Sequence, residues 1–340
     1  MARSPYVKRL MDPSSPWLFR ALQLFSAAAI SLSIAVQLGL QNPFWAAMPV
    51  WVVAQPFRQD LFLRAILRIG GTAVGAAVGW SALMLLPDPA ARVLVISVVV
   101  GAGAAATYWI GSVYSYGVLM AAITAVVVLV PAMDHPVNAG ALALDRIWCT
   151  MIGVVVVTLI TFAFTPRRTA SAPILLKPMP RVTLRHGVLA GLTALLGGVI
   201  LMAVGGPLGM GAALALCIFS LIIGSSRNPI PILRYLPLGA TIGVIAAILY
   251  RWLDVSLTDP VGMALLLALP FIGAGALMRA HPRTAPFGLD ANMCFLLAAE
   301  AGAAGHGLTV HIQGGLALIT AAFGFVALFH IVGDKGQGTS

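Results

Sequence analysis

Charged residues are scarce in this sequence. Asp, Glu, Lys and Arg together make up 9% of the 340 residues, whereas 60% are hydrophobic. A water-soluble domain normally carries about 25% charged residues, because its surface must interact with water. This shortage excludes a soluble enzyme and places most of the chain within a lipid bilayer.

Cysteine is also rare, and the three copies have no paired spacing. Cys149, Cys217 and Cys294 each lie inside an apolar run. Structural zinc sites and disulfide frameworks need cysteines grouped at short, regular intervals. We therefore expect three small buried side chains here, and neither a metal site nor a cofactor.

Motifs for catalysis or nucleotide hydrolysis are missing as well. The sequence contains no phosphate-binding loop and no nucleophile placed beside a base at a recognisable spacing. The formal net charge of +10 could serve nucleic-acid binding, but the basic residues stand in short groups between apolar runs, without interleaved aromatics. We expect neither an enzyme, nor an ATP-driven pump, nor a nucleic-acid partner.

Long apolar runs are what the sequence has in quantity. A helix of about 20 apolar residues crosses the hydrocarbon core of a bilayer, which is about 30 Å thick. The runs predict an all-α, polytopic membrane protein with about twelve transmembrane helices. The expected spans are residues 20–40, 44–57, 65–86, 92–110, 115–132, 144–165, 186–204, 208–226, 235–253, 261–279, 290–305 and 312–332.

Basic residues collect on one side of these spans. With the N-terminus in the cytoplasm, 17 of the 20 Lys and Arg residues fall inside, and only Arg92, Arg146 and Arg251 fall outside. Cytoplasmic loops of membrane proteins retain Lys and Arg. The pattern predicts a multi-pass protein with both termini in the cytoplasm.

The two halves of the chain resemble each other. Arg68 follows Arg20 by 48 residues, Arg234 follows Arg185 by 49, and each second arginine is followed by two glycines four residues apart. Because six spans per half is an even number, the repeats should be parallel, related about an axis along the membrane normal. We expect a first six-helix repeat at 1–165, a short basic cytoplasmic linker at 166–185 and a second repeat at 186–340.

Glycines recur every fourth residue in the third span of each half. Gly71, Gly75 and Gly79 lie on one helix face in the first half, and Gly239 and Gly243 do so in the second. Small residues at this spacing let two membrane helices approach closely. We expect these five glycines to be helix-packing positions.

Prolines interrupt the second span, which also carries Trp45. Pro49 lies inside it, and the corresponding eighth span is bounded by Pro207 and Pro229. Short, proline-interrupted segments at matching places in two repeats indicate a transport site, although Trp45 could equally belong to the aromatic belt at the membrane surface. The candidate substrate-binding residues are Trp45, Pro49, Gln55, Arg68 and Arg234, where the two arginines either bind an anion or only set the topology.

Glu300 stands alone in an apolar segment, residues 293–304. A charged side chain at mid-membrane costs on the order of 2.5–3.5 kcal/mol on insertion scales. Holding it neutral would require a pKa rise of roughly 2.7 units, which costs a comparable free energy. Glu300 is therefore either a proton-coupling or substrate-binding residue, or a buried hydrogen-bonding group.

Three motifs in the first half resemble those of a known family. They are Gln-Asn-Pro-Phe-Trp-Ala-Ala-Met at residues 41–48, Gln-Pro at 55–56, and Arg-Ile-Gly-Gly-Thr-Ala-Val-Gly-Ala at 68–76. In order and spacing they are similar to the signature of the fusaric acid resistance and aromatic acid exporter family, over about residues 17–165. The second half matches only through its six spans. Many members insert a large cytosolic domain between the halves, where this chain has only residues 166–185.

The resemblance implies export of aromatic or other organic acids across a bacterial inner membrane, often beside a periplasmic adaptor protein. From it and the doubled layout we expect a secondary transporter for small organic anions, with proton coupling as an added drive. A non-transporting scaffold or assembly subunit of an envelope complex is the alternative. That alternative predicts no continuous cavity between the halves.

Overall fold

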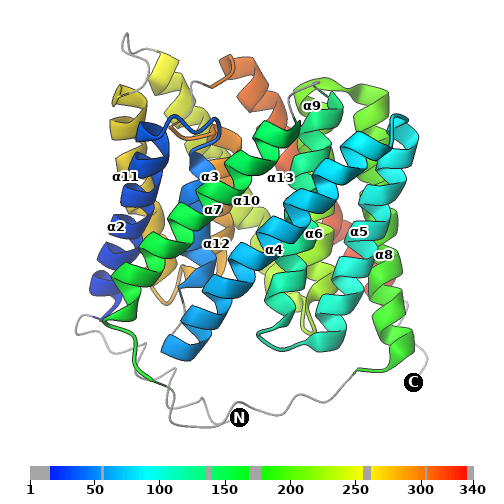
Figure 1. Cartoon of the computed structure of the whole chain (residues 1–340), viewed down its shortest axis with the longest axis horizontal. Coiled ribbons are helices and arrows are strands. Elements are labelled where there is room, and N and C mark those ends of the chain that lie inside the picture. The colour runs from blue at the N-terminus through cyan, green and yellow to red at the C-terminus, as the bar shows by residue number, and fades with distance from the viewer. Residues whose placement is uncertain are drawn as a thin grey trace.

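The computed structural model describes residues 16–54, 57–134, 139–167, 178–255, 262–302 and 305–334. Within these ranges every regular element is an α-helix (Figure 1), which confirms the predicted fold class. The twelve helices of this part of the chain are α2 (Pro16–Gln37), α3 (Phe44–Val53), α4 (Arg58–Leu85), α5 (Pro89–Ile110), α6 (Ser115–Asp134), α7 (Ala139–Phe162), α8 (Pro180–Val204), α9 (Gly206–Ser225), α10 (Ile230–Val255), α11 (Gly262–Ala280), α12 (Ala285–Ala299) and α13 (Leu308–Asp334).

Ten of these helices are long and apolar enough to cross a membrane. The exceptions are α3, with 10 residues, and α12, with 15. At 1.5 Å per residue they extend only about 15 and 22 Å, less than the hydrocarbon core of about 30 Å. Each therefore ends inside the thickness of the bundle.

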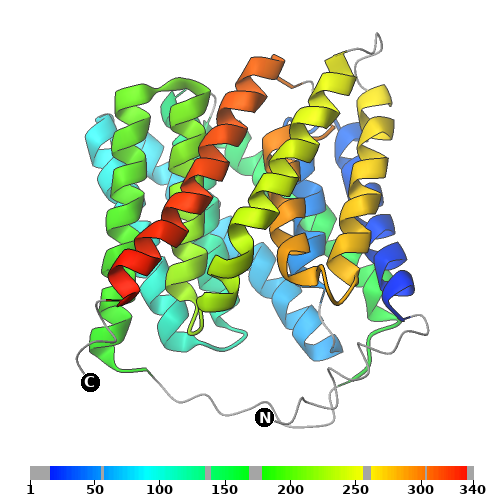
Figure 2. The same cartoon turned by 180° about the vertical axis from the view of Figure 1, so that it is seen from behind.

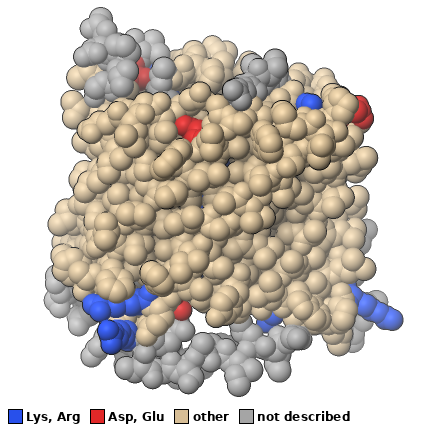
Figure 3. Space-filling view, viewed as in Figure 1, with Lys and Arg blue, Asp and Glu red and all other residues tan. Residues whose placement is uncertain are grey.

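The outer surface has the charge distribution of a membrane protein. In Figure 3 most of the Lys and Arg side chains lie along the lower edge, one lies near the upper edge, and the middle of this face carries no charge. Large apolar side chains point outward, among them Leu85 at 76% and Leu159 at 71% exposure. A broad exposed apolar surface of this kind fits contact with lipid tails.

Local sequence explains where the helices begin and end, and α5 is a clear case. The carboxylate of Asp88 accepts hydrogen bonds from the backbone N–H groups of Ala90 and Ala91, and Pro89 occupies the first turn. At the other end Gly111 adopts a left-handed conformation with φ +57°. An Asp cap, an early proline and a terminal glycine are the usual signals for the two ends of a helix.

The same helix pairs recur in the two halves. In the first half α4 packs on α6 and α7, and α3 packs on α7; in the second half α10 packs on α12 and α13, and α9 packs on α13. These pairs join elements of the same rank in each half, as expected for parallel repeats. Figures 1 and 2 show the two sets on opposite sides of the bundle. The exact domain boundaries stay a prediction.

The halves are also interlocked. The fourth helix of each half packs against the first helix of the other, which gives the pairs α5–α8 and α2–α11. At the first of these interfaces a side chain on Gly101 would meet the backbone of Gly187 and Gly191. The hydroxyl of Ser97 donates a 2.8 Å hydrogen bond to the carbonyl of Gly191. Here the two backbones are in direct contact.

Two expectations from the sequence need correction. The predicted linker, 166–185, is shorter, because α8 begins at Pro180; residues 168–177 lie outside the described ranges. The two short helices are α3 and α12, and not the second helix of each half. Pro207 lies in the first turn of α9 and Pro229 beyond its end, so neither proline interrupts it.

Candidate functional site

A cavity of about 520 Å³ lies at the centre of the bundle, between the two halves. Most of its wall comes from α3, α6, α9 and α12, which are the second and fifth helices of each half. The cavity therefore lies on the axis that relates the two repeats. Its volume falls in the range of roughly 300–1,000 Å³ that small-molecule sites occupy.

Each of the four helices presents one face to the cavity. On α3 the lining residues are Trp45, Met48 and Val52, which are spaced three and four residues apart along one side. The other three helices contribute similar stripes: Tyr116, Leu119, Met120 and Ile123 from α6; Ala215, Ile218, Phe219 and Ile222 from α9; and Leu289, Asp290, Met293, Cys294 and Leu297 from α12.

The cavity lies against the basic face of the molecule. Ser112 and Ser115, in and just after the turn between α5 and α6, line it, as do Pro231 and Pro286 near the starts of α10 and α12. The first turns of α4 belong to the same end, where Figure 3 shows the Lys and Arg side chains. An anion that approaches this end meets positive charge before it meets the apolar wall.

Two arginines one helical turn apart on α4 supply positive charge inside the cavity. Arg64 donates to the carbonyl of Val52 at 3.2 Å, and its guanidinium lies over the ring of Tyr116 at 4.9 Å. Arg68 is buried, with 8% exposure, and donates to the hydroxyl of Tyr116 at 3.3 Å; it also contacts the sulfur of Met120.

The Nε atoms of both arginines are buried and have no hydrogen-bond partner in the structure. A buried donor without a partner costs on the order of 1–3 kcal/mol, and more when it is charged. The pairing found here satisfies only part of each guanidinium. An arginine fork matches the geometry of a carboxylate, so a bound carboxylate would offer the missing acceptor.

One acidic side chain faces the same cavity from the opposite half. Asp290 lines it from α12, next to Tyr235 of α10. Its Cβ packs on Gly239, and the charge of Arg279 on α11 acts on its carboxyl group. The cavity thus contains an apolar wall, two cations on one side and one carboxyl group on the other.

The structure places Trp45 on the cavity wall and Pro49 away from it. The guanidinium of the buried Arg146 lies over the Trp45 ring, on the side of α7. Pro49 packs against Gly153 of α7 and does not line the cavity. Because proline has no N–H, it leaves the carbonyl of Trp45 without its helical donor.

Arg234 is exposed on α10, with its guanidinium 5.5 Å from the ring of Tyr235, and does not line the cavity. Arg68 precedes its first packing glycine by three residues and Arg234 by five. Two residues turn a helix by about 200°, so the two arginines face nearly opposite directions. Gln55, the remaining candidate, lies outside the described residues.

The five glycines lie where two helices meet closely. A side chain on Gly71, Gly75 or Gly79 would meet α6, and one on Gly239 or Gly243 would meet α12. At Gly75 the obstacle is the carbonyl oxygen of Ala121, and at Gly243 that of Ala291. The positions agree with the expected packing role, which stays a prediction until the substitutions are made.

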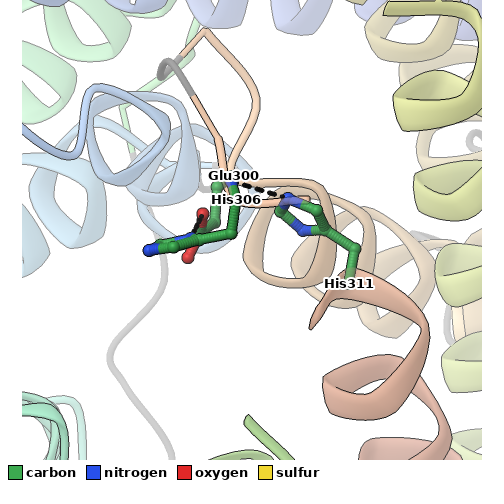
Figure 4. A group of neighbouring side chains, drawn as sticks. All are labelled: Glu300, His306 and His311. Carbon is green, nitrogen blue, oxygen red and sulfur yellow. Dashed lines mark hydrogen bonds and ion pairs between the residues drawn. The ribbon is translucent and has the colours of Figure 1, made fainter. Parts of the chain in front are cut away.

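The sequence predicted that Glu300 lies inside a continuous span, and this is wrong. The helix α12 ends one residue before it, and Glu300 itself is left-handed with φ 47°. Its carboxylate bonds to Nδ1 of His306 at 2.9 Å, in the loop between α12 and α13 (Figure 4). The hydrogen bond with Glu300 raises the pKa of His306.

Burial raises the pKa of Glu300, but the bond to His306 and the charges of His306, His311 and Arg251 outweigh it, so this pKa lies below its usual value. Both pKa shifts favour the ionised forms of Glu300 and His306. The proton-coupling role stays a prediction, and the structure does not favour it, because the lowered pKa of Glu300 favours its charged form.

Several cavity residues could not be singled out from the sequence. Tyr116, Tyr235 and Met293 line the cavity, yet they occur in apolar runs like any other buried residues. Every face of these helices is apolar, so periodicity does not separate a cavity wall from a lipid-facing side. The signals that the sequence did give were Trp45 and Arg68, which belong to the motifs at residues 41–48 and 68–76.

The described part of the chain has twelve helices, ten of them long and apolar enough to cross a membrane, around a cavity between its two halves. These features define a polytopic α-helical membrane protein. The chain belongs to the fusaric acid resistance protein family, which matches residues 16–174 and, separately, residues 177–337. The second half therefore matches the family in its own right, which the sequence motifs alone did not reveal. No solved structure matches the chain.

Curated relatives are efflux pump subunits. The p-hydroxybenzoic acid efflux pump subunit AaeB of Musicola paradisiaca is 27% identical over 165 residues, which cover 45% of this chain and 25% of that protein. The proteins of the same name from Enterobacter cloacae and Edwardsiella ictaluri are 26% and 28% identical over 161 and 160 residues, with 43% of this chain and 24% of each relative covered. The matched stretch thus spans about a quarter of each relative.

Proposed function

We propose that this protein is a secondary exporter of small organic acids, with aromatic carboxylates as its substrate class, in a bacterial inner membrane. The observation that carries the proposal is the central cavity of about 520 Å³, with apolar walls and the half-satisfied Arg64 and Arg68. An aromatic carboxylate has the same two parts, an apolar ring and a planar anion that an arginine fork can bind. The names of the relatives point to the same substrate class.

The membrane potential supplies a drive for this export. Moving one negative charge out of a cell that is negative inside is downhill by about 2.3 kcal/mol per 100 mV. The basic face, which we place in the cytoplasm, then attracts the anion toward the cavity. A periplasmic adaptor is part of the proposal, because the relatives are named as subunits of a pump.

A scaffold without transport is the alternative, and it predicts polar groups that are satisfied within the protein. The Nε atoms of Arg64 and Arg68 are buried without a partner beside an open volume between the halves. A purely structural role gives no reason to keep two cations in such a place, since each carries a desolvation cost. The exporter accounts for both features.

Transport of a radiolabelled hydroxybenzoate into everted membrane vesicles tests the proposal. We expect accumulation that depends on the protein and increases when a potential, positive in the vesicle lumen, is imposed. Vesicles with an equal amount of the Arg64→Ala/Arg68→Ala double variant are the matched control. Absence of protein-dependent movement across a panel of aromatic and aliphatic acids, with an adaptor protein supplied, would reject the exporter in favour of the scaffold.

Asp290 is the carboxyl group best placed to couple export to protons, because it lines the same cavity as the two arginines. We expect Asp290→Asn to remove the response of export to an imposed proton gradient and to keep the response to the potential. The two responses are measured separately in everted vesicles with ionophores. A full proton response in the variant would place coupling elsewhere, and Glu300→Gln in the same assay tests the position expected from the sequence.

A further inference from the structure

Three potential metal ligands meet at the end of α12, outside the central cavity. Glu300 ends that helix, His306 lies in the following loop and His311 lies in the first turn of α13. One ligand atom from each lies within 4.8 Å of the other two. Figure 4 shows Glu300 and His306 side by side, with His311 reaching toward them from its helix.

These distances are close to those of a metal site. Nitrogen and oxygen ligands lie at about 2.0–2.2 Å from zinc, and at a tetrahedral centre this places them roughly 3.4 Å apart. The Oε2 atom of Glu300 and Nδ1 of His306 are already 2.9 Å apart. The three ligand atoms, at most 4.8 Å apart, would have to approach one another by about 1.4 Å at most to reach this spacing.

His311 is oriented as a ligand. Its Nδ1 is 2.8 Å from the carbonyl oxygen of Ala298, so Nδ1 carries the proton and donates. The lone pair on Nε2 then accepts a hydrogen bond from the backbone N–H of His306 at 3.2 Å. A histidine that donates its other N–H to a backbone carbonyl is the common second-shell arrangement at metal sites.

Side chains of α10 hold the backbone around Glu300 in place. Arg251 is 2% exposed and donates to the carbonyls of Ala299 at 2.6 Å and Glu300 at 2.9 Å, while it pairs with Asp254 at 2.7 Å. The hydroxyl of Tyr250 accepts the N–H of Gly302 at 3.3 Å. Two side chains of α10 thus fix the end of α12 and with it the backbone of Glu300.

We propose that Glu300, His306 and His311 form a binding site for a divalent transition-metal ion of the zinc type. Two imidazoles and one carboxylate are a ligand set that zinc uses with a water at the fourth position. The ion takes the place of the proton shared by His306 and Glu300, which is released to the solution. Nε2 of His311 gives up its hydrogen bond with the backbone N–H of His306 and binds the metal instead. The sequence predicted no metal site, because the ligands follow no cysteine–histidine pattern and the fold alone brings them together.

A bound ion would join the end of α12 to the start of α13. Leu297 of α12 and Leu318 of α13 both line the central cavity, so the site is linked to the cavity wall through two helices. His306 is 64% exposed and Glu300 26%, which leaves the site open to ions in the surrounding solution. The proposal does not depend on the transported substrate.

Zinc titration of the purified full-length chain in detergent, with any affinity tag removed, tests this site. We expect one Zn²⁺ per chain by calorimetry, and a Co²⁺ absorption spectrum of low-symmetry coordination that added Zn²⁺ abolishes. His306→Ala and Glu300→Gln should each weaken binding at least ten-fold. The matched control is His281→Ala, because His281 lies near the opposite end of α12, before its first residue.

Thermal unfolding gives a second readout, in which the melting temperature of each protein with Zn²⁺ is compared with that of the same protein without it. Zn²⁺ should raise the melting temperature of the wild-type chain and of His281→Ala, and leave that of His306→Ala unchanged. A wild-type chain without saturable zinc binding overturns the proposal. So does a pair of monodisperse variants, His306→Ala and Glu300→Gln, that bind zinc as tightly as the wild type.

Discussion

Replacing Arg68 by alanine should reduce the export of a hydroxybenzoate by about ten-fold or more. A hydrogen bond to a charged group contributes about 1.5–3 kcal/mol, and 1.4 kcal/mol corresponds to a factor of ten. Arg68 is buried in the cavity wall with an unpaired Nε, so its loss removes a carboxylate partner that water cannot easily replace. Initial rates in everted vesicles, corrected for the amount of protein, measure the effect.

Arg234→Ala is the matched comparison, because both arginines lie on the third helix of their half. Arg234 is exposed and turned away from the cavity, so we expect its replacement to change the rate by less than about two-fold. Equal losses in the two variants would contradict a specific site at Arg68. They would show that the positive charge of the basic face as a whole determines the rate.

Replacing Gly75 by alanine should strongly destabilise the protein. The new methyl group would meet the carbonyl oxygen of Ala121 on α6, as well as the Cβ of Thr124. Overpacking typically costs 1–3 kcal/mol, occasionally more, and here the obstacle is backbone, which cannot rotate away. Gly243→Ala should behave alike, because its methyl group would meet the carbonyl of Ala291. Thermal unfolding in detergent measures both.

Gly70→Ala is the control on the same helix. A Cβ at Gly70 meets no atom within 4 Å, and alanine favours a helix over glycine by roughly 0.5–1 kcal/mol. This variant should be as stable as the wild type or slightly more stable. If Gly70→Ala and Gly75→Ala lowered the melting temperature equally, the close approach of α4 to α6 would not be the cause.

Much of the fold could be predicted from the sequence, because the length of an apolar run determines whether a segment can span a bilayer. Each of the twelve helices in the described residues overlaps an expected span, but α3 and α12 are too short to cross the bilayer, so ten spans stand where about twelve were predicted. The ends were less predictable. The run around residues 293–304 remains apolar past the point where α12 stops, and Glu300, Gly302 and Gly305 turn the chain with positive φ values. Hydropathy carries no information about backbone conformation.

The site was only partly accessible to sequence reasoning. Arg68 and Trp45 were found because they belong to a motif, and both line the cavity. Arg234 was grouped with Arg68 because the two follow their first arginines at nearly equal spacing, and an offset of two residues reverses the direction of a helical side chain. Glu300 and His306 belong together only after the loop folds, since a contact across a turn leaves no periodic signal.

The crossed pairs α5–α8 and α2–α11 limit how the two sides of the membrane could be made accessible in turn. If one half were to swing as a rigid block against the other, the backbone contact of Gly101 with Gly187 and Gly191 would have to separate. We therefore expect the frame formed by the long helices to stay in place while a smaller part moves. The short helices α3 and α12 line the cavity and are too short to belong to that frame, so we expect them to be the part that moves.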